Sequence, residues 1–480
     1  MTAPRVLLSI PNTLSTRNLL RTDVLPVVRE AAERVIVIAP FAEEPAFKSE
    51  FLGDDSVVGF PMSAYRPHRL ERAVRSMIYN LYLSGPVPDS LQLFLHRWAE
   101  NHPRVGRFRP HVTRGVLPVF RGLLPPLHRL FVATGDAGSY DVLLRRERPD
   151  VAVFSRLFFT DEIPLMRAAV RAGIPTVGVV ASWDNLTTKG PLLPRLDRLI
   201  VWNELMREEA VRYHGYRPEQ VTVTGAPHHD AVFNDRDTLP TRDAFFARLG
   251  LDPAKRLITY AGEDPIIAPD APQYVELLHT FLRDERLRGA CQLLVRPHPQ
   301  DDPRRFDRFR GRSGVAVDLP GRPSDGHWMD MSRRDLINLY ATMRWSDVVV
   351  NVTSTIVLDA AFFDTPTVCI GFSYSAAPTF YQSPLRFFEM DHFRYVMRAG
   401  ATTLATTETE LLEAVNSSLE DRARKAPGRR RIVDELAQFR DGGSGRRVAE
   451  AIMAAISTAP ARAGAERRST AAAAAPARAR

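Results

Sequence analysis

Residues 345–371, WSDVVVNVTSTIVLDAAFFDTPTVCIG, decide the fold class of this chain. The three valines at 348–350 form a continuous β-branched run, which is typical of a strand buried on both faces of a sheet. A helix is predicted over 356–363, and a second buried strand over 367–370. The stretch therefore predicts a strand–helix–strand unit in a parallel sheet.

Polar residues occupy the turn that leads into this helix. Ser354 or Thr355 is placed to cap the helix, whose free N–H groups and partial positive charge suit a phosphate. Asp359 lies one turn further along on the same face, where a carboxylate can accept hydrogen bonds from sugar or ribose hydroxyls. The alternative is that all three are ordinary residues of a cap and a first turn.

Composition sets the broad class. A chain of 480 residues is long enough for two or three domains, and 45% hydrophobic with 25% charged residues is ordinary for a soluble protein. The two cysteines, Cys291 and Cys369, lie in apolar runs and are expected to be buried thiols of a reducing compartment. We find no signal-peptide layout at the start and no run of about 18 apolar residues, so we expect a cytoplasmic protein without a membrane span.

The net charge of +8 is unevenly distributed. Residues 457–480 hold five Arg and one Glu in an Ala- and Pro-rich context, which predicts a disordered, solvated basic tail. Residues 97–148 hold ten Arg and four acids within a helical insertion expected at about 64–148. This insertion is expected either to contact an anionic acceptor or the inner face of a membrane, or to be a solvated helical hairpin. We expect no nucleic-acid partner.

Alternating strand and helix patterns divide the rest of the chain into two α/β halves. The expected domains are 1–232, which contains the helical insertion, and 242–456, joined by a linker at 233–241. Closing helices are expected at 408–419, 431–439 and 446–456, and one or more of them is expected to return to the first domain. The first strand–helix–strand unit lacks the Gly-x-Gly-x-x-Gly pattern of a dinucleotide site. The prediction is two doubly wound, Rossmann-like domains whose carboxyl edges face a shared cleft.

Four groups of loop residues are expected to meet in that cleft, because open α/β sheets bind ligands outside the carboxyl ends of their strands. They are Asn12 and Arg17, then Asp184 and Lys189, then Gly262, Glu263, Arg296 and His298, and finally Ser354, Thr355 and Asp359.

Two of these residues are candidates for catalysis. Asp184 lies between Trp183 and Asn185, where a carboxylate can act as general base for an acceptor hydroxyl or simply hold an Asx turn. His298 lies between two prolines, which fix its direction, and can donate a hydrogen bond to a diphosphate or, protonated, offset leaving-group charge. Arg296 can offer a bidentate fork to a phosphate.

The remaining candidates are contacts. Glu263 or Asp264 is a further base or a ribose contact. Asn12, Arg17 and Lys189 are expected to contact acceptor or phosphate.

No metal or cofactor site is expected. His228, His229 and Asp230 resemble metal ligands, but adjacent residues on one turn rarely point at one ion. We therefore expect an interdomain turn there, with a substrate contact. The chain also lacks a cysteine cluster, a Walker loop and a Gly-x-Ser-x-Gly elbow.

Three motifs together resemble the GT-B glycosyltransferase superfamily, in particular its CDP-glycerol glycerophosphotransferase-like branch. Arg-Pro-His-Pro at 296–299 is similar to that branch's RPHP. Ser354, Thr355 and Asp359 resemble its donor-binding Ser-Ser…Asp helix start, and ASWDNLTTKG at 181–190 resembles its Trp-His-Gly…Lys loop in spacing. The resemblance covers about 174–372. It departs at Asp184, where the branch has the histidine that is thought to act as base.

The resemblance implies a nucleotide-diphosphate donor held mainly by the second domain, without a bound metal. It favours a transferase that moves a sugar from a nucleotide-sugar to a surface polysaccharide or a lipid-linked glycan. The alternatives are a polyol-phosphate transferase of the CDP-glycerol type, a sugar-nucleotide 2-epimerase, and an inactive GT-B-like scaffold.

Overall fold

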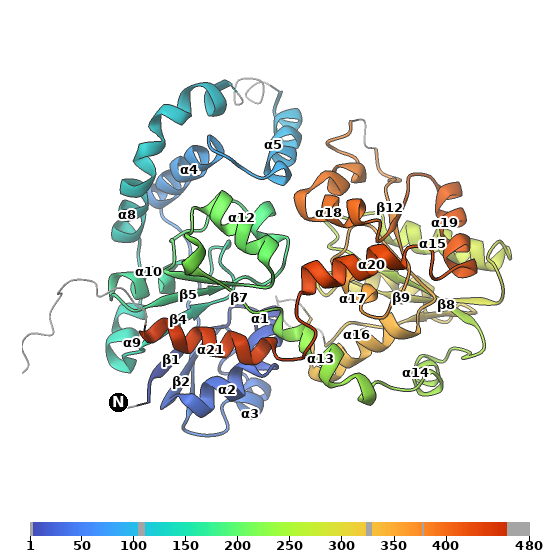
Figure 1. The fold of residues 1–480 in the computed structure, drawn as a ribbon, viewed down its shortest axis with the longest axis horizontal. Helices are drawn as coiled ribbons and strands as arrows, with labels where there is room; N and C mark the ends of the chain where they lie inside the picture. Colours follow the sequence, from blue (N-terminus) through green and yellow to red (C-terminus); the bar gives the residue numbers. More distant parts are fainter. Residues whose placement is uncertain (1–2, 104–110, 323–328, 377–378, 458–480) are drawn as a thin grey trace, which may run out of the picture.

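The computed structural model describes residues 3–103, 111–322, 329–376 and 379–457. They form two halves side by side, each built on a parallel sheet (Figure 1). The first sheet has the order β3-β2-β1-β4-β5-β6-β7. Its strands are β1 (Arg5–Ser9), β2 (Arg34–Ala39), β3 (Val57–Pro61), β4 (Val151–Phe154), β5 (Thr176–Val179), β6 (Arg198–Val201) and β7 (Val221–Val223).

The second sheet has the order β10-β9-β8-β11-β12-β13, and all of its described pairs are parallel. Its strands are β8 (Arg256–Ala261), β9 (Cys291–Arg296), β10 (Val315–Val317), β11 (Val348–Asn351), β12 (Thr367–Ile370) and β13 (Thr403–Ala405). The strands β11 and β12 are those predicted from residues 345–371, and they pair directly.

Burial on both faces explains the continuous apolar runs. In β1, Leu7 packs into one hydrophobic cluster with Ile36, whereas Val6 and Leu8 pack into another on the opposite face. Successive side chains of a strand point to opposite faces, so a strand covered on both sides must be apolar at every position. The predicted architecture of two Rossmann-like domains is confirmed.

Helices cover both sheets, and η marks short helical turns. The first half contains α1 (Thr13–Ser15), η1 (Thr16–Leu20), α2 (Val24–Ala31), α3 (Pro45–Phe51), α9 (Tyr140–Glu147), α10 (Ile163–Arg171), α11 (Asn185–Thr188), α12 (Glu204–His214) and η4 (Pro218–Gln220). The junction contains η5 (Pro227–His229), α13 (Asp230–Asn234) and η6 (Arg236–Thr238). The second half contains α14 (Arg242–Leu249), α15 (Ala271–Arg283), η7 (Pro303–Phe309), α16 (Arg333–Trp345), α17 (Ile356–Ala361), η8 (Pro384–Glu389), α18 (Asp391–Ala399), α19 (Glu408–Glu420), α20 (Ala426–Ile432) and η9 (Val433–Ala437).

The last described helix, α21 (Ser444–Ser457), belongs to the first half. The second domain predicted at 242–456 is corrected there, whereas the expected return of a closing helix to the first domain is observed. Helix α21 packs against α2 and across the first sheet, where Figure 1 shows it in red. Val448 and Ile452 are fully buried there beside Val151 and Val153. An amphipathic helix gains stability wherever an apolar sheet face lacks cover, and that face was in the other half.

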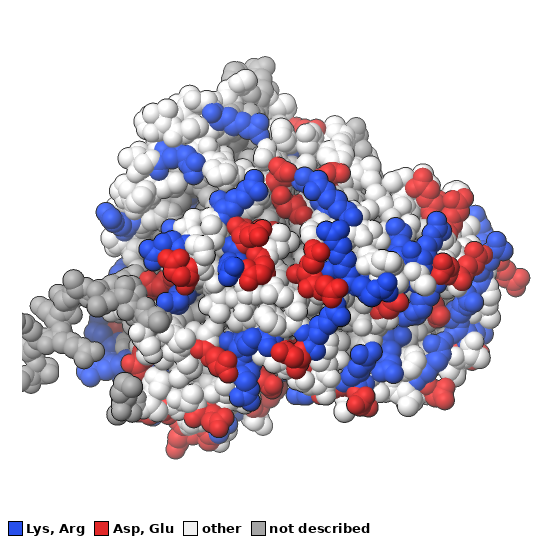
Figure 2. Space-filling view, viewed as in Figure 1, with Lys and Arg blue, Asp and Glu red and all other residues white. Residues whose placement is uncertain are grey.

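The helical insertion consists of α4 (Arg69–Leu83), α5 (Asp89–Asn101), η2 (Val112–Val116), η3 (Leu117–Leu123) and α8 (Leu124–Thr134). The run Val112–Thr134 is helical throughout and mostly unburied, and by length and composition it is long and apolar enough to cross a membrane. The sequence analysis, which expected no membrane span, did not single out this run. The surface over α4 and α8 is mostly uncharged, with scattered basic side chains (Figure 2). The predicted basic tail lies outside the described residues, except for its first residue, Ser457.

Candidate functional site

A cavity of about 500 Å³ lies between the two halves, at the carboxyl ends of both sheets. All the candidate residues that the sequence singled out line this cavity, a convergence that parallel-sheet topology requires. They are Asn12, Arg17, Asp184, Lys189, Gly262, Glu263, Arg296, His298, Ser354, Thr355 and Asp359.

Gly262 and His298 belong to neighbouring strand-end loops that pack backbone to backbone. The amide of Gly262 donates to the carbonyl of Arg296 at 2.8 Å, and a Cβ at position 262 would lie 2.7 Å from the backbone nitrogen of His298. Only glycine fits that approach. Burial lowers the pKa of His298 to about 4, although Asp264 opposes the shift, so its imidazole is neutral at physiological pH.

The hydrogen bonds of His298 fix its tautomer. Its Nδ1 accepts from the amide of Gln300 at 3.2 Å, so Nε2 carries the proton and can donate. Of the two roles expected for His298, the neutral hydrogen-bond donor fits this geometry, and the cation does not.

Arg296 is only partly free to hold a phosphate. Its Nη1 donates to Asp318 at 2.9 Å, and Asp318 also pairs with Arg248. The Nη2 of Arg296 is buried and has no hydrogen-bond partner among the described residues. The expected bidentate contact of Arg296 with a phosphate is therefore reduced to its Nη2 group, because Nη1 already donates to Asp318.

The turn before α17 differs in detail from the prediction. Ser354 is buried, and its hydroxyl accepts from the amide of Ile356 at 3.4 Å. Thr355 is exposed and its side chain caps nothing in α17. The helix ends at Ala361, two residues before the predicted end. Ser354 therefore acts as the cap, and Thr355 is one of the residues that line the cavity.

Glu263 is buried beside Ser354, which hydrogen-bonds to it. Burial raises the pKa of Glu263 to about 7, and Asp264 and Asp184 contribute to the rise. Its Oε2 has no hydrogen-bond partner among the described residues. A carboxyl group with a pKa near 7 and one oxygen without a partner suits either of the two roles expected for Glu263, a proton acceptor or a contact to a hydroxyl group.

Asp359 faces the first half instead of the solvent. Its Oδ1 lies 3.6 Å from Nε2 of His229, and the charge of Arg17 also acts on it. Burial raises the pKa of Asp359 to about 7, against the opposing effect of Arg17. His228 and His229 pack with their ring centroids 4.2 Å apart and line the cavity. The expected interdomain turn is thus part of the cavity wall.

The loop of Asp184 is internally braced. The carboxylate accepts from Thr188 Oγ1 and from Asn185 Nδ2, both at 3.1 Å. Burial opposes ionisation, but His392 and Lys189, with hydrogen bonds from Ser182 and Thr188, hold the pKa of Asp184 below its ordinary value. Asp184 is therefore an ionised residue that holds a turn, as one of its two expected roles required.

Asn12 is also engaged. Its Oδ1 accepts from both the amide and the hydroxyl of Ser15 at 2.9 Å, which caps α1. Its fixed position lies at the cavity wall, where only part of the amide group remains for a ligand.

His392 was missed by the sequence analysis. It is the second residue of α18, it lines the cavity, and its ring packs edge-on against Trp183 with centroids 5.5 Å apart. No local pattern marks it, because it comes from a helix far from any motif.

Phe94 and Arg97 of α5 also line the cavity, so the insertion reaches the site.

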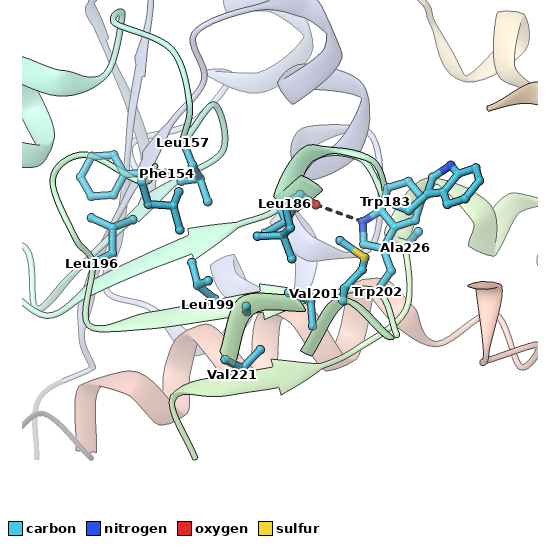
Figure 3. Packing of buried hydrophobic residues seen from close by; sticks show 14 of the residues in the cluster. Phe154, Leu157, Trp183, Leu186, Leu196, Leu199, Val201, Trp202, Val221 and Ala226 are labelled. Carbon is cyan, nitrogen blue, oxygen red and sulfur yellow. Dashed lines mark hydrogen bonds between the residues drawn. The ribbon is translucent and has the colours of Figure 1, made fainter. Parts of the chain in front are cut away.

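The wall behind Trp183 is a rigid hydrophobic cluster. Figure 3 shows Trp183 and Trp202 at one end of this cluster, and Phe154 and Leu196 at the other. The indole of Trp202 donates to the carbonyl of Val180 at 3.0 Å, the dashed line in Figure 3. The loop that carries Asp184 therefore rests on a packed base.

Both basic and acidic side chains line the cavity, and its carboxyl groups belong to Asp184, Glu263, Asp264 and Asp359. Among residues 3–103, 111–322, 329–376 and 379–457, no group of three or more His, Cys, Asp or Glu side chains is arranged to hold a metal ion.

Comparisons with known proteins agree with this architecture. A protein described as a UDP-N-acetylglucosamine 2-epimerase from Listeria monocytogenes has a TM-score of 0.55 at 12% identity, over 95% of this chain and 96% of that one. The UDP-GlcNAc 2-epimerase of Neisseria meningitidis has a TM-score of 0.54 at 11% identity, over 94% of this chain and 100% of that one. A search of curated proteins gave no match. The chain is a GT-B-fold protein, as the sequence predicted.

The sequence of residues 188–454 matches the family described as CDP-Glycerol:Poly(glycerophosphate) glycerophosphotransferase. The match covers more than half of the chain and includes the whole cavity wall of the second half. The chain belongs to this family of transferases, and the resemblance seen in its motifs is confirmed.

Proposed function

We propose that this chain is a metal-independent transferase that takes a sugar from a nucleotide-diphosphate donor and passes it to a hydroxyl of a surface polysaccharide or lipid-linked glycan. It needs no bound cofactor, because the donor is itself a substrate. The observation that carries the proposal is the cavity, where loops of the second half that lie within the family match face loops of the first half.

Cationic groups and hydrogen-bond donors in the cavity lining support this proposal. A nucleotide diphosphate needs positive charge or hydrogen-bond donors to offset its own charge, and transferases without metals obtain these from side chains and backbone amides. Arg17, Lys189, Nη2 of Arg296 and Nε2 of His298 are the donors offered here. The carboxyl of Glu263 is placed among them as a hydroxyl contact.

A second candidate is transfer of a polyol phosphate from a CDP-linked donor. The family match favours it, because the family is described by that reaction. We place sugar transfer first because Asp184 occupies the position of the histidine expected in that branch. The GT-B likeness to 2-epimerases shows the fold alone, so epimerisation and an inactive scaffold are left as outcomes for experiment.

The helical insertion binds this enzyme peripherally to the inner face of a membrane. Exposed apolar side chains lie along the helical run 112–134, which includes α8. Among them, Val119 is 82% exposed. Residues 112–134 hold three Arg and no acid. Three prolines, at 118, 125 and 126, remove backbone donors and disfavour a crossing. An apolar helix that carries several Arg is suited to bind at the surface of an anionic bilayer, because its apolar side chains enter the headgroup region and its Arg side chains attract anionic lipids. The exposed apolar residues are Val112, Val116, Val119, Phe120, Leu123 and Leu130.

Vesicle flotation tests this placement. We expect the full chain to bind vesicles containing phosphatidylglycerol, to bind neutral vesicles less, and to lose binding when Val119 and Phe120 are both changed to Glu. Val142→Glu, at an exposed apolar position on α9 and outside the run 112–134, is the matched control. Equal binding by the double variant and the wild type would refute the membrane surface.

Nucleotide binding and turnover test the transferase. A thermal-shift screen with CDP, UDP, GDP, ADP and dTDP, with and without Mg²⁺, is expected to give a metal-independent rise in Tm for one diphosphate. Donors of that class are then incubated with and without glycan acceptors. CDP alone would favour the polyol-phosphate candidate, conversion of a UDP-sugar without acceptor would show an epimerase, and no shift at all would indicate a scaffold.

A further inference from the structure

We infer that a second cavity, beside the helical insertion, binds the phosphate group of the membrane lipid that carries the acceptor glycan. The inference rests on the proposed function and deepens it, because it selects the lipid-linked glycan from the two acceptor classes. The second cavity has a volume of about 360 Å³ and shares no lining residue with the cavity between the two halves. Cavities of that order hold small ligands.

The walls of the second cavity come from the insertion and from the body of the first half. Helix α4 contributes Tyr82, and the run 112–134 contributes Arg121 and Leu124. The opposite wall includes Leu192 and the end of α12, residues 212–216. The run that carries the exposed apolar side chains is therefore also a wall of the cavity, so a lipid in contact with this run lies next to it.

Three arginines give the cavity a positive lining. Arg121, Arg195 and Arg212 line it, and all three are exposed and so accessible to a ligand. No Asp or Glu is among the described residues that line it. A guanidinium pairs with two phosphate oxygens at once, and phosphate is the anionic group of many bilayer lipids. The charge of the lining therefore complements a lipid phosphate.

Aromatic rings and backbone hold two of these arginines in place. The guanidinium of Arg195 lies over the ring of Tyr216, with Cζ 4.7 Å from the ring centroid, and its Nη2 donates to the carbonyl of Gly215 at 2.6 Å. The guanidinium of Arg121 lies against Gly85, in the space that a Cβ would need. Because these cations are already positioned, binding a phosphate costs less side-chain entropy.

Accessible apolar groups lie beside the arginines. Leu124, Pro125, Pro86 and Pro191 line the cavity and are exposed or half-buried. An amphiphile can place its phosphate at the cations and the first carbons of its chain against these groups, which removes apolar surface from water. A free phosphate ion would leave that surface wet. The lining therefore favours a lipid phosphate over a free anion.

One loop forms part of both cavities. Lys189 lines the cavity between the halves, and Pro191 lines the second one. Gly190 between them has a φ of +88°, and a Cβ there would lie 2.8 Å from the ring of Tyr79 on α4. The chain thus turns against the insertion as it passes from one cavity to the other. An acceptor held by its phosphate on one side of this loop lies next to the proposed donor site on the other.

Calorimetry with a soluble lipid tests the site without a membrane. The probe is dihexanoyl phosphatidic acid below its critical micelle concentration, titrated into the full chain. We expect saturable binding by the wild type. The double variant Arg121→Gln with Arg212→Gln should bind at least about tenfold more weakly, because it loses charged hydrogen bonds to the phosphate. Arg72→Gln with Arg129→Gln, at exposed positions of α4 and α8 outside the cavity, removes the same charge and should bind as the wild type does.

Other outcomes of the calorimetry would overturn the site. No binding by the wild type would do so directly. Equal weakening in the two double variants would show a general attraction of charges. Equal affinity for inorganic phosphate would assign the cavity to a free anion, and equal affinity for dihexanoyl phosphatidylcholine would show binding of the chains without recognition of an anionic headgroup.

Turnover tests the link to the acceptor, with the donor found by the thermal-shift screen. We expect Arg121→Gln with Arg212→Gln to raise KM for a glycan linked to a lipid phosphate at least about tenfold. Its kcat and KM for the same glycan without the lipid phosphate should equal those of the wild type. An equal change with both acceptors would overturn the role in acceptor binding. A wild type that binds no nucleotide defeats the proposed function instead, and the calorimetry still decides the lipid site.

Discussion

His229 Nε2 lies 3.6 Å from Asp359 Oδ1, a contact between the junction of the two halves and the helix that follows β11. Burial raises the pKa of Asp359 to about 7, whereas burial and Arg17 lower the pKa of His229 to about 3. Near neutral pH, therefore, the histidine is uncharged and Asp359 is the member of the pair that titrates.

The first prediction follows from the sign of the Asp359 shift. An acid whose pKa is higher in the folded than in the unfolded chain stabilises the fold below its unfolded pKa, and this contribution is lost as pH rises through about 7. Asp359→Asn should therefore gain about 2 kcal/mol relative to wild type between pH 5 and pH 8. Urea unfolding at both pH values measures this, with Asp237→Asn at an exposed position as control. A pH-independent difference would contradict the assignment.

The second prediction concerns the contact between α5 and α18. Ser90 is fully buried and bonds to Asp391 through its hydroxyl. Removing a buried hydroxyl that bonds to a charged group costs about 2 kcal/mol, so Ser90→Ala should lower the urea midpoint. Ser139→Ala, at an exposed position, should leave it within error. If both variants unfold alike, the contact does not stabilise the joined halves.

The third prediction concerns the anchor of the insertion. Arg167 pairs with Glu71 at 2.9 Å, and the two side chains are 0% and 1% exposed. The guanidinium also donates to the hydroxyl of Tyr65 at 3.0 Å. Removing one partner leaves a buried unpaired charge, so Glu71→Ala should cost about 3 kcal/mol. The double variant Glu71→Leu with Arg167→Met, which removes both charges, should restore much of that stability.

The exposed pair of Arg217 and Glu219 is the control for this experiment. Its side chains are 71% and 65% exposed, and Glu219→Ala should change the free energy of unfolding by less than about 1 kcal/mol. A loss of equal size at the two sites would show that burial does not set the energy of the Glu71 pair.

The fourth prediction concerns the contact between the two donor loops. A methyl group at position 262 would meet backbone atoms of the Pro297–His298 segment, which cannot move as a side chain does. Gly262→Ala should therefore displace His298 and abolish the nucleotide-induced Tm rise. Gly53→Ala, where a Cβ would meet no atom within 4 Å, is the control. Unaltered nucleotide binding by Gly262→Ala would exclude these loops from the donor site.

Much of the fold was predictable from local pattern. The strand predicted at 367–370 is β12 with the same bounds, and the valine run at 348–350 became β11 with one further residue, because a strand buried on both faces must be apolar along its length. The candidate residues were found for a related reason. Each follows such a run, and parallel strands bring their carboxyl ends to one edge.

Local sequence was sufficient for two parallel sheets, their facing edges and the loops between them, since a period of two or of 3.6 residues is a short-range property. Tertiary structure alone decided that α21 is the closing helix that packs on the first sheet, paired Arg296 with Asp318 and brought His392 beside Trp183. These outcomes depend on which buried surfaces and charges meet after folding. Burial then set the pKa values of Glu263 and Asp359, because desolvation acts on a group only once its surroundings exist.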